Sequence, residues 1–156
     1  MKKTLNLLLL VVVLLLQTKA TFAQQQTSNE KTYRTVEVEK NNTEVFNQCI
    51  DYLFSMDYFI LSIDQNAGFI QAKKFTPINK VFSFKNGDKE TYNFLIRPVS
   101  SNTSKITLSI YLETQYYSGS DSKVFYYEDK GISQDEMLYT KTLNNLFDYI
   151  VQKQSK

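Results

Sequence analysis

The sequence predicts a two-layer α+β domain in which two helices pack on one face of an antiparallel sheet of about five or six strands. Several segments alternate apolar and polar residues with a period of two, which is typical of half-buried strands. Two other segments repeat their apolar residues every three or four positions, as amphipathic helices do. The links between the strand segments are short, so neighbouring strands are expected to be antiparallel. The expected order of elements is β-α-β-β-β-β-β-α.

Residues 1–23 have the features of a signal peptide. Two lysines precede a ten-residue apolar run at positions 7–16, and a Thr-Phe-Ala sequence ends at Ala23, which is the pattern of a secretory leader. The run is half as long as the roughly 20 apolar residues of a membrane-spanning helix, so no stable membrane insertion is expected after the leader is removed. Cys49 lies far beyond the leader and cannot be the acylated first residue of a bacterial lipoprotein. The protein is therefore expected in the periplasm or outside the cell.

The composition of the mature chain narrows the classes of function. Removal of the leader leaves 133 of the 156 residues, a length that fits one domain with its own core. The whole chain has a formal net charge of +2, but the leader takes three lysines with it, so 15 basic and 16 acidic side chains give the mature chain a charge of −1. No basic block is left to neutralise phosphates, so no nucleic-acid partner is expected. Histidine, the commonest general base and zinc ligand, is absent, so we expect no enzyme, no metal site and no cofactor.

Residues 24–31 are polar and rich in glutamine, so they are expected to form a flexible linker ahead of a single domain at residues 32–154. The domain begins with a strand at residues 34–39, where valines alternate with glutamates. Asn42 or Thr43 is expected to cap the helix that follows. The apolar positions of this helix recur at helical spacing and are expected to face the core: Val45, Phe46, Cys49, Ile50, Leu53 and Phe54.

The period of two then returns in a predicted hairpin. Residues 58–63 and 69–75 form its strands around a turn at residues 64–68, where aspartate, asparagine and glycine tolerate the backbone geometry of a turn. Pro77 is expected to end the second strand of this hairpin.

A second hairpin is predicted around Asn86 and Gly87, a pair that is typical of two-residue hairpin turns. Its strands are residues 81–84 and 92–96. A further strand is expected at residues 106–112, where apolar residues alternate strictly with more polar ones, so that one face is buried and the other is solvated.

The C-terminal helix has the clearest start signal in the chain. The sequence leaves open whether residues 124–127 add a short extended piece before it. The sequence from Ser133 to Glu136 fits a capping box. Ile132 is expected to pack against Met137 as a hydrophobic staple. The residues expected to form the buried stripe of this helix are Tyr139, Leu143, Leu146, Phe147 and Ile150.

A weak motif runs from the first helix into the first hairpin: Phe46, Leu53, Tyr58, Ile60, Asp64, Gly68, Phe69, Ile70 and Ala72. The motif resembles a pattern in small secreted bacterial proteins of the Bacteroidetes type, which have a TBP-like fold and unknown function. It is more distantly similar to the C-type lipoprotein of the outer-membrane barrel-assembly machine. The resemblance covers residues 32–154 and implies a TBP-like fold with binding or assembly work and no catalytic residues.

These observations favour a non-catalytic binding or assembly module, periplasmic or secreted, whose partner is an envelope protein or envelope component. Tyr116, Tyr117, Tyr126 and Tyr127 flank an expected flexible loop at residues 118–122. They form the candidate interaction surface, because tyrosine combines contact area with a polar tip and is enriched at interfaces. The other interpretation, in which alternate members of these pairs pack inward as ordinary strand aromatics, stays open.

Two other functional classes have specific candidates in the sequence. A helix-grip carrier of a small apolar ligand or lipid is the alternative function, because eleven Phe and eleven Tyr are available to line a cavity. An enzyme is disfavoured, since Glu37 and Glu39, about 7 Å apart on one strand face, are already explained as a solvated face. Cys49 lies in the helical stripe and is interpreted as a buried core residue and not as a reactive thiol.

Overall fold

The computed structural model describes residues 31–78, 83–118 and 124–152. The elements in chain order are the 3-10 helix η1 (Thr32–Arg34), the strand β1 (Thr35–Val38), the helix α2 (Asn42–Ser55), the strands β2 (Phe59–Asp64), β3 (Phe69–Pro77), β4 (Lys85–Ser100), β5 (Thr103–Tyr117) and β6 (Phe125–Ile132), and the helix α3 (Glu136–Gln152). This order has the predicted succession of element types, but β4 takes the place of the predicted second hairpin and β6 extends the short piece considered at residues 124–127. The predicted signal peptide, nearly all of the predicted linker and most of the predicted loop at residues 118–122 lie outside the described residues.

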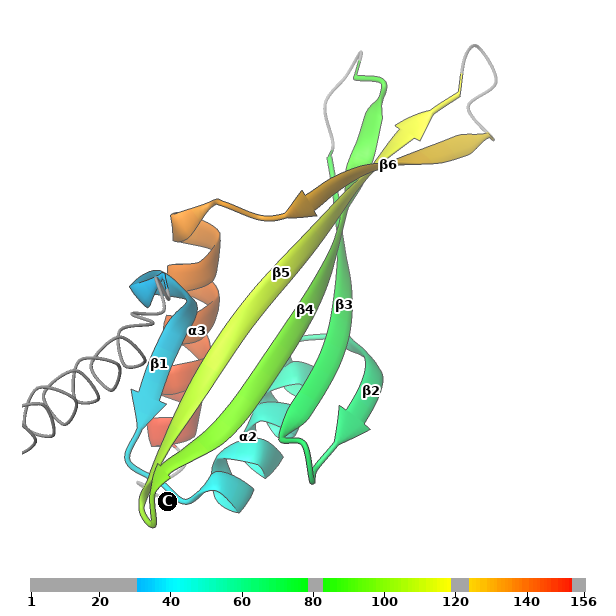
Figure 1. The fold of residues 1–156 in the computed structure, drawn as a ribbon. Coiled ribbons are helices and arrows are strands. Elements are labelled where there is room, and N and C mark those ends of the chain that lie inside the picture. The colour runs from blue at the N-terminus through cyan, green and yellow to red at the C-terminus, as the bar shows by residue number, and fades with distance from the viewer. Residues whose placement is uncertain (1–30, 79–82, 119–123, 153–156) are drawn as a thin grey trace, which may run out of the picture. The chain divides into compact units, whose positions relative to one another are not determined.

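The six strands form one antiparallel sheet, and both long helices cover the same face of it (Figure 1). The strand order is β1-β5-β4-β3-β2, and β6 pairs with β5. The core lies between the sheet and the helices. It is formed by Val38, Val45, Phe46, Cys49, Tyr52, Leu53, Ile70, Ala72, Tyr92, Phe94, Ile96, Ile106, Leu108, Ile110, Tyr139, Leu143, Leu146 and Ile150. The predicted α+β class is thereby confirmed.

Strands β3, β4 and β5 run on past the helices and form a twisted extension of the sheet with β6, which we call the arm (Figure 1). The arm consists of residues 75–77 of β3, 85–89 of β4, 113–117 of β5 and 125–129 of β6. Neither α2 nor α3 covers the arm in Figure 1, and most of its side chains are exposed or half-buried. Side chains on both faces of the arm are therefore available for contacts outside the core.

Strands β1 and β6 pair with successive parts of the same edge of β5. The pairing with β1 ends where Thr35 lies opposite Thr107, and the pairing with β6 begins where Tyr111 lies opposite Ile132. Between these two stretches, the backbone carbonyl of Ile110 accepts a hydrogen bond of 2.8 Å from the N–H of the residue that follows β6. Ser133, which lies between β6 and α3, thus bonds to the edge of β5 in the gap between the two strands.

Asn86 and Gly87 do not form a hairpin turn, so the predicted second hairpin is wrong. Both residues lie inside β4, where Gly87 pairs with Pro77 of β3 and with Gln115 of β5. A register shift at Asn86 marks a β-bulge. Pairing on both sides satisfies backbone groups along the whole strand, whereas a two-residue turn satisfies only local ones, and this outweighs the turn preference of the pair. The first predicted strand of that hairpin, residues 81–84, lies partly outside the described residues.

The start and the buried face of α2 differ in detail from the prediction. The N-cap is Asn41 and not Asn42 or Thr43, and its side-chain oxygen accepts a hydrogen bond of 3.0 Å from a backbone N–H of the first turn. Phe54 is exposed, although it was expected in the buried stripe, and Tyr52 is buried in its place. The buried stripe of the helix passes through Cys49, Tyr52 and Leu53, and Phe54, the next residue along the helix, lies outside this stripe.

The start of α3 is capped by Asp135, and the predicted capping box at Ser133 is wrong in its register. The Asp135 carboxylate accepts hydrogen bonds of 3.0 Å and 3.3 Å from the N–H groups of Met137 and Leu138. The predicted staple between Ile132 and Met137 is also wrong, because the Met137 side chain is 80% exposed. Ser133 lies before the helix, where its N–H donates a hydrogen bond to the carbonyl of Ile110 and its hydroxyl oxygen accepts one from the N–H of Asp135.

Candidate functional site

The four tyrosines that were predicted to form an interaction surface lie on β5 and β6, two neighbouring strands of the arm. Tyr116 and Tyr126 are register partners, and their rings stack at a centroid distance of 5.4 Å and an interplanar angle of 17°. Tyr117 and Tyr127 point to the opposite face, because successive side chains of a strand alternate. The four side chains therefore belong to two faces of the arm. Their role in binding stays a prediction.

The sheet face that the helices leave open carries two lysines and three aromatic side chains from four strands. We call this group the lysine–aromatic patch: Phe59, Lys73, Phe75, Lys89 and Tyr127. The Lys73 ammonium lies 4.8 Å from the ring centroid of Phe59, and the Lys89 ammonium lies 4.9 Å from that of Tyr127. Each cation is therefore held over the face of a ring, where the ring quadrupole attracts it. The patch lines a hollow of about 370 Å³ at the base of the arm.

The two lysines of the patch differ in whether a carboxylate neutralises them. Lys89 forms an ion pair of 2.5 Å with Glu113 on the neighbouring strand. Lys74 and Asp57 also line the hollow, and the Lys74 ammonium donates a hydrogen bond of 3.1 Å to a backbone carbonyl at the end of α2. In the part of the chain that the structure describes, Lys73 forms no ion pair with a carboxylate. Lys73 therefore provides a cationic group whose charge the described residues do not neutralise directly.

Gly87 lies close to the ring of Phe75, one of the residues that line this hollow. A Cβ atom at this position would lie 2.4 Å from Cζ of Phe75 and 2.7 Å from the backbone oxygen of Thr76. Both distances are far shorter than a van der Waals contact, so the ring of Phe75 can lie across β4 only because residue 87 is glycine. The glycine that predicted a turn in the sequence instead allows an aromatic ring to lie close to the backbone.

The lysine–aromatic patch was not predicted as a site. Its residues come from strands that are widely separated in the sequence, and only the register of the sheet brings them together. One signal was present in the sequence: in the predicted strand at residues 69–75, Lys73 and Phe75 share the face opposite to the core residues Ile70 and Ala72.

Strand β2 forms one free edge of the sheet, next to the patch. Within the described ranges it pairs with β3 alone, and its other side faces no strand (Figure 1). Phe59, Leu61 and Ile63 of this strand are 63%, 44% and 47% exposed. A register shift between Ile60 and Ser62 marks a β-bulge in the strand. An edge strand with free backbone groups and exposed apolar side chains is able to pair with a further strand.

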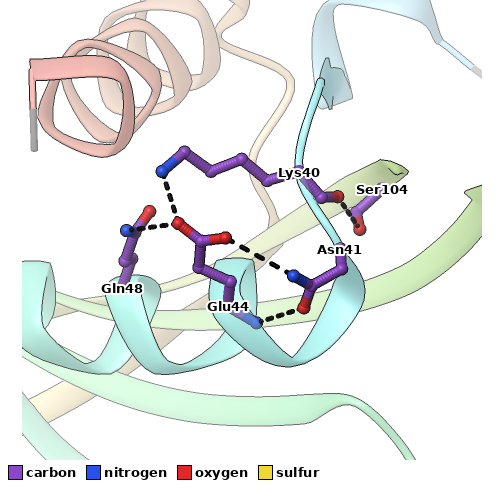
Figure 2. Close-up of polar contacts among 5 residues, drawn as sticks. All are labelled: Lys40, Asn41, Glu44, Gln48 and Ser104. Atoms are coloured by element: carbon purple, nitrogen blue, oxygen red, sulfur yellow. Dashed lines mark hydrogen bonds and ion pairs between the residues drawn. The ribbon is translucent and has the colours of Figure 1, made fainter. Parts of the chain in front are cut away.

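A second polar cluster lies where β1 turns into α2, at the end of the sheet opposite to the arm (Figure 1), and Figure 2 shows its contacts. The Lys40 ammonium forms an ion pair of 2.6 Å with Glu44, and Gln48 donates a hydrogen bond of 3.2 Å to the same carboxylate. The other carboxylate oxygen accepts a hydrogen bond from the side chain of Asn41. Ser104 on β5 donates a hydrogen bond of 2.8 Å to the backbone carbonyl of Lys40. These contacts fix the start of α2 to the sheet, and we assign the cluster a structural role.

A chain of titratable side chains lies where the core meets the arm. Tyr92 donates a hydrogen bond of 2.5 Å to Glu90, and its ring meets that of Tyr58 edge to face at a centroid distance of 5.0 Å. Burial raises the pKa of Glu90, and the hydrogen bond from Tyr92 opposes this rise. Burial also raises the pKa of Tyr92 and of Tyr58. At neutral pH both phenols are therefore protonated, and Tyr92 donates its proton to the hydrogen bond with Glu90.

Cys49, Glu37 and Glu39, the other residues considered for chemistry in the sequence, lie on the faces that helical spacing and strand alternation predicted. Cys49 is fully buried in the core, and burial raises the pKa of its thiol. Glu37 and Glu39 are exposed, whereas Val38 between them is buried. Among the described residues, no group of three or more His, Cys, Asp or Glu side chains is arranged to hold a metal ion. The described helices include none that is long and apolar enough to cross a membrane.

Comparisons with known proteins find likenesses among solved structures. No protein-family model and no curated protein matches the chain. The structure is similar to that of a TBP-like protein from Parabacteroides distasonis ATCC 8503, at 16% sequence identity and a TM-score of 0.36, over 78% of this chain and 86% of that chain. The α+β architecture of the present chain stands on its own strand order and register.

Proposed function

We propose that this protein is a non-catalytic binding module of the periplasm or cell exterior, which receives an extended segment of another envelope protein along strand β2. The open edge of β2 carries this proposal. Its backbone groups on the open side are not used by the sheet, and its side chains Phe59, Leu61 and Ile63 offer apolar surface to an added strand. In strand addition, main-chain hydrogen bonds supply affinity and the side-chain positions supply specificity.

The composition of β2 supports this proposal. Natural sheets protect their edges with lysines, prolines or inward-pointing charges, and the sequence from Phe59 to Asp64 contains none of these before its last residue. The bulge at Leu61 is the one protective feature of this strand, and bulges are also frequent beside functional sites, where they redirect side chains. An edge that keeps three exposed apolar residues is costly unless a partner covers them.

The packing of the core favours a surface site over the alternative function, a carrier of a small apolar ligand. The aromatic side chains of Phe46 and Phe94 and the aliphatic side chains of Leu53 and Leu146 are fully buried between the sheet and the helices. They occupy the space that a carrier of the helix-grip type would keep for its ligand.

Site-specific photo-crosslinking in the native host tests this proposal. A photoreactive phenylalanine analogue replaces Ile63 on β2, and the matched control places it at Asn144, an exposed position on α3. We expect a discrete crosslinked adduct from position 63 and none from position 144. The substitution Leu61→Lys is expected to reduce the adduct from position 63, because a charge on the edge opposes strand addition. Equal crosslinking from both positions, or none from either, would refute binding at β2.

A further inference from the structure

The lysine–aromatic patch lies directly beside the open edge of β2, and Phe59 belongs to both. Phe59 is the register partner of Lys73, so both side chains lie on the face that the helices leave open. A strand added to β2 would continue this row, because side chains opposite one another in a sheet share a face. Adjacent strands are about 4.8 Å apart, so the long side chain of Lys73 can reach across Phe59 to a residue of the added strand.

The charges of the patch favour one kind of side chain at the position of the added strand that lies opposite Phe59. Lys89 is neutralised by Glu113 at 2.5 Å, whereas Lys73 is held only over the ring of Phe59 among the described residues. A carboxylate on the added strand would pair with Lys73 without displacing an existing ion pair. A lysine or arginine at that position would meet Lys73 as a like charge.

We propose that the segment received by β2 is acidic, with a glutamate or aspartate opposite Phe59 whose carboxylate binds the ammonium of Lys73. This inference rests on the proposed function and specifies the chemistry of the partner. The aromatic walls of the hollow lower the exposure of the ion pair to water, which strengthens it relative to a fully solvated pair. The residues of the partner on either side of the acidic one point away from the patch, since side chains alternate along a strand.

Peptide selection tests the inference with a defined probe, a random dodecapeptide display library, on four forms of the mature chain. The forms are the unmodified protein, Lys73→Glu, the edge-blocked double variant Leu61→Lys/Ile63→Lys, and the control Lys141→Glu, which makes the same charge change at an exposed position on α3. We expect the unmodified protein and the control to select peptides enriched in acidic residues. Lys73→Glu is expected to lose that enrichment, and the edge-blocked variant is expected to select no peptides.

A charge swap gives the second measurement. For the best selected peptide, we expect Lys73→Glu to weaken binding by about five- to tenfold at low salt. Replacing the critical acidic residue of the peptide by lysine is expected to restore binding to Lys73→Glu and to weaken binding to the unmodified protein. Circular dichroism of each variant shows whether it is folded, and the exposed positions of Leu61 and Ile63 make loss of the fold an unexpected result.

The outcomes separate this inference from the proposed function. Peptides that depend on Leu61 and Ile63 but show the same acidic content with Lys73→Glu would overturn the inference and leave the proposed function standing. Failure of the unmodified protein to select any peptide would overturn both. Binding of dextran sulfate that depends on Lys73 and is unaffected by the edge-blocking substitutions would show a polyanion site, and would overturn the peptide partner.

Discussion

The hydroxyl of Tyr139 on α3 accepts a hydrogen bond of 3.0 Å from the backbone N–H of Ile110 on β5. Ile110 lies in the interval between β1 and β6, where β5 has no strand partner on that side. A side chain of the helix therefore completes the hydrogen bonding of a buried strand. The guanidinium of Arg34 covers the ring of Tyr139 at 4.7 Å and also donates a hydrogen bond of 2.8 Å to the carbonyl of Ser133.

Tyr139→Phe is expected to destabilise the protein because it leaves the Ile110 N–H buried without an acceptor. We expect the free energy of unfolding to fall by about 1–3 kcal/mol, as measured by urea denaturation. Tyr126→Phe is the matched control: it removes a hydroxyl from an exposed tyrosine of the arm and is expected to change stability by less than about 0.5 kcal/mol. Equal effects of the two substitutions would contradict the role assigned to Tyr139.

Two glycines with positive φ allow the effect of a steric clash on stability to be measured apart from the effect of backbone strain. Gly68 has a φ of 62° and Gly131 a φ of 71°, but a Cβ at Gly68 would lie 2.2 Å from the backbone oxygen of Ile96, whereas one at Gly131 would meet nothing within 4 Å. Gly131→Ala is expected to cost about 1–2 kcal/mol through strain alone. Gly68→Ala is expected to cost at least about 2 kcal/mol more, because the Ile96 backbone must move. Equal unfolding midpoints for the two variants would show that β3 and β4 do not pack as described.

The ion pair between Lys40 and Glu44 is expected to respond differently to removal of each partner. The Lys40 side chain is 5% exposed and the Glu44 side chain is 43% exposed. Glu44→Ala leaves a buried ammonium without its carboxylate and is expected to cost about 1–3 kcal/mol. Lys40→Met keeps the packing of the aliphatic stem and leaves a solvated carboxylate, so a loss below about 1 kcal/mol is expected.

Thermal and urea unfolding of the two single variants and the double variant measure this difference. The double variant is expected to be more stable than Glu44→Ala alone, because it no longer buries an unpaired charge. If the two single substitutions cost the same and their effects add, the cluster in Figure 2 is a surface contact and not a buried ion pair.

Glu90 is expected to make stability depend on pH. Burial raises the pKa of Glu90 above its ordinary value of 4.5, so the folded state binds the proton more tightly than the unfolded state. The contribution of Glu90 to stability is therefore greatest below pH 4.5 and is lost as the pH rises through the folded pKa. Glu90→Gln, which keeps an acceptor for Tyr92, is expected to become more stable relative to the unmodified protein as the pH rises from 4.5 towards neutrality.

The comparison is made by urea denaturation of both proteins at several pH values between 4 and 7, roughly the range in which carboxylates of raised pKa titrate. The difference between their free energies of unfolding isolates Glu90 from the other titrating groups. A difference that stays constant over this range would show that the pKa of Glu90 is the same in both states.

Alternation and helical spacing predicted the faces of most elements correctly, because they depend on local backbone geometry. Ile70 and Ala72 are buried where the alternation of β3 placed them, and Cys49 lies in the helical stripe that its spacing indicated. The same local reasoning failed at Asn86 and Gly87, where pairing with two neighbouring strands competes with the turn preference of the dipeptide.

The sequence by itself determined the class of the fold and the order of its elements, since each segment carries its own periodicity and a face that must be buried. It also placed Lys73 and Phe75 on the open face of their strand. Only the tertiary structure decided that Phe59, Lys89 and Tyr127 join them, and that β2 ends the sheet. The reason is that strand order and register depend on pairing between segments distant in the chain, and the pattern within one segment does not specify its neighbours.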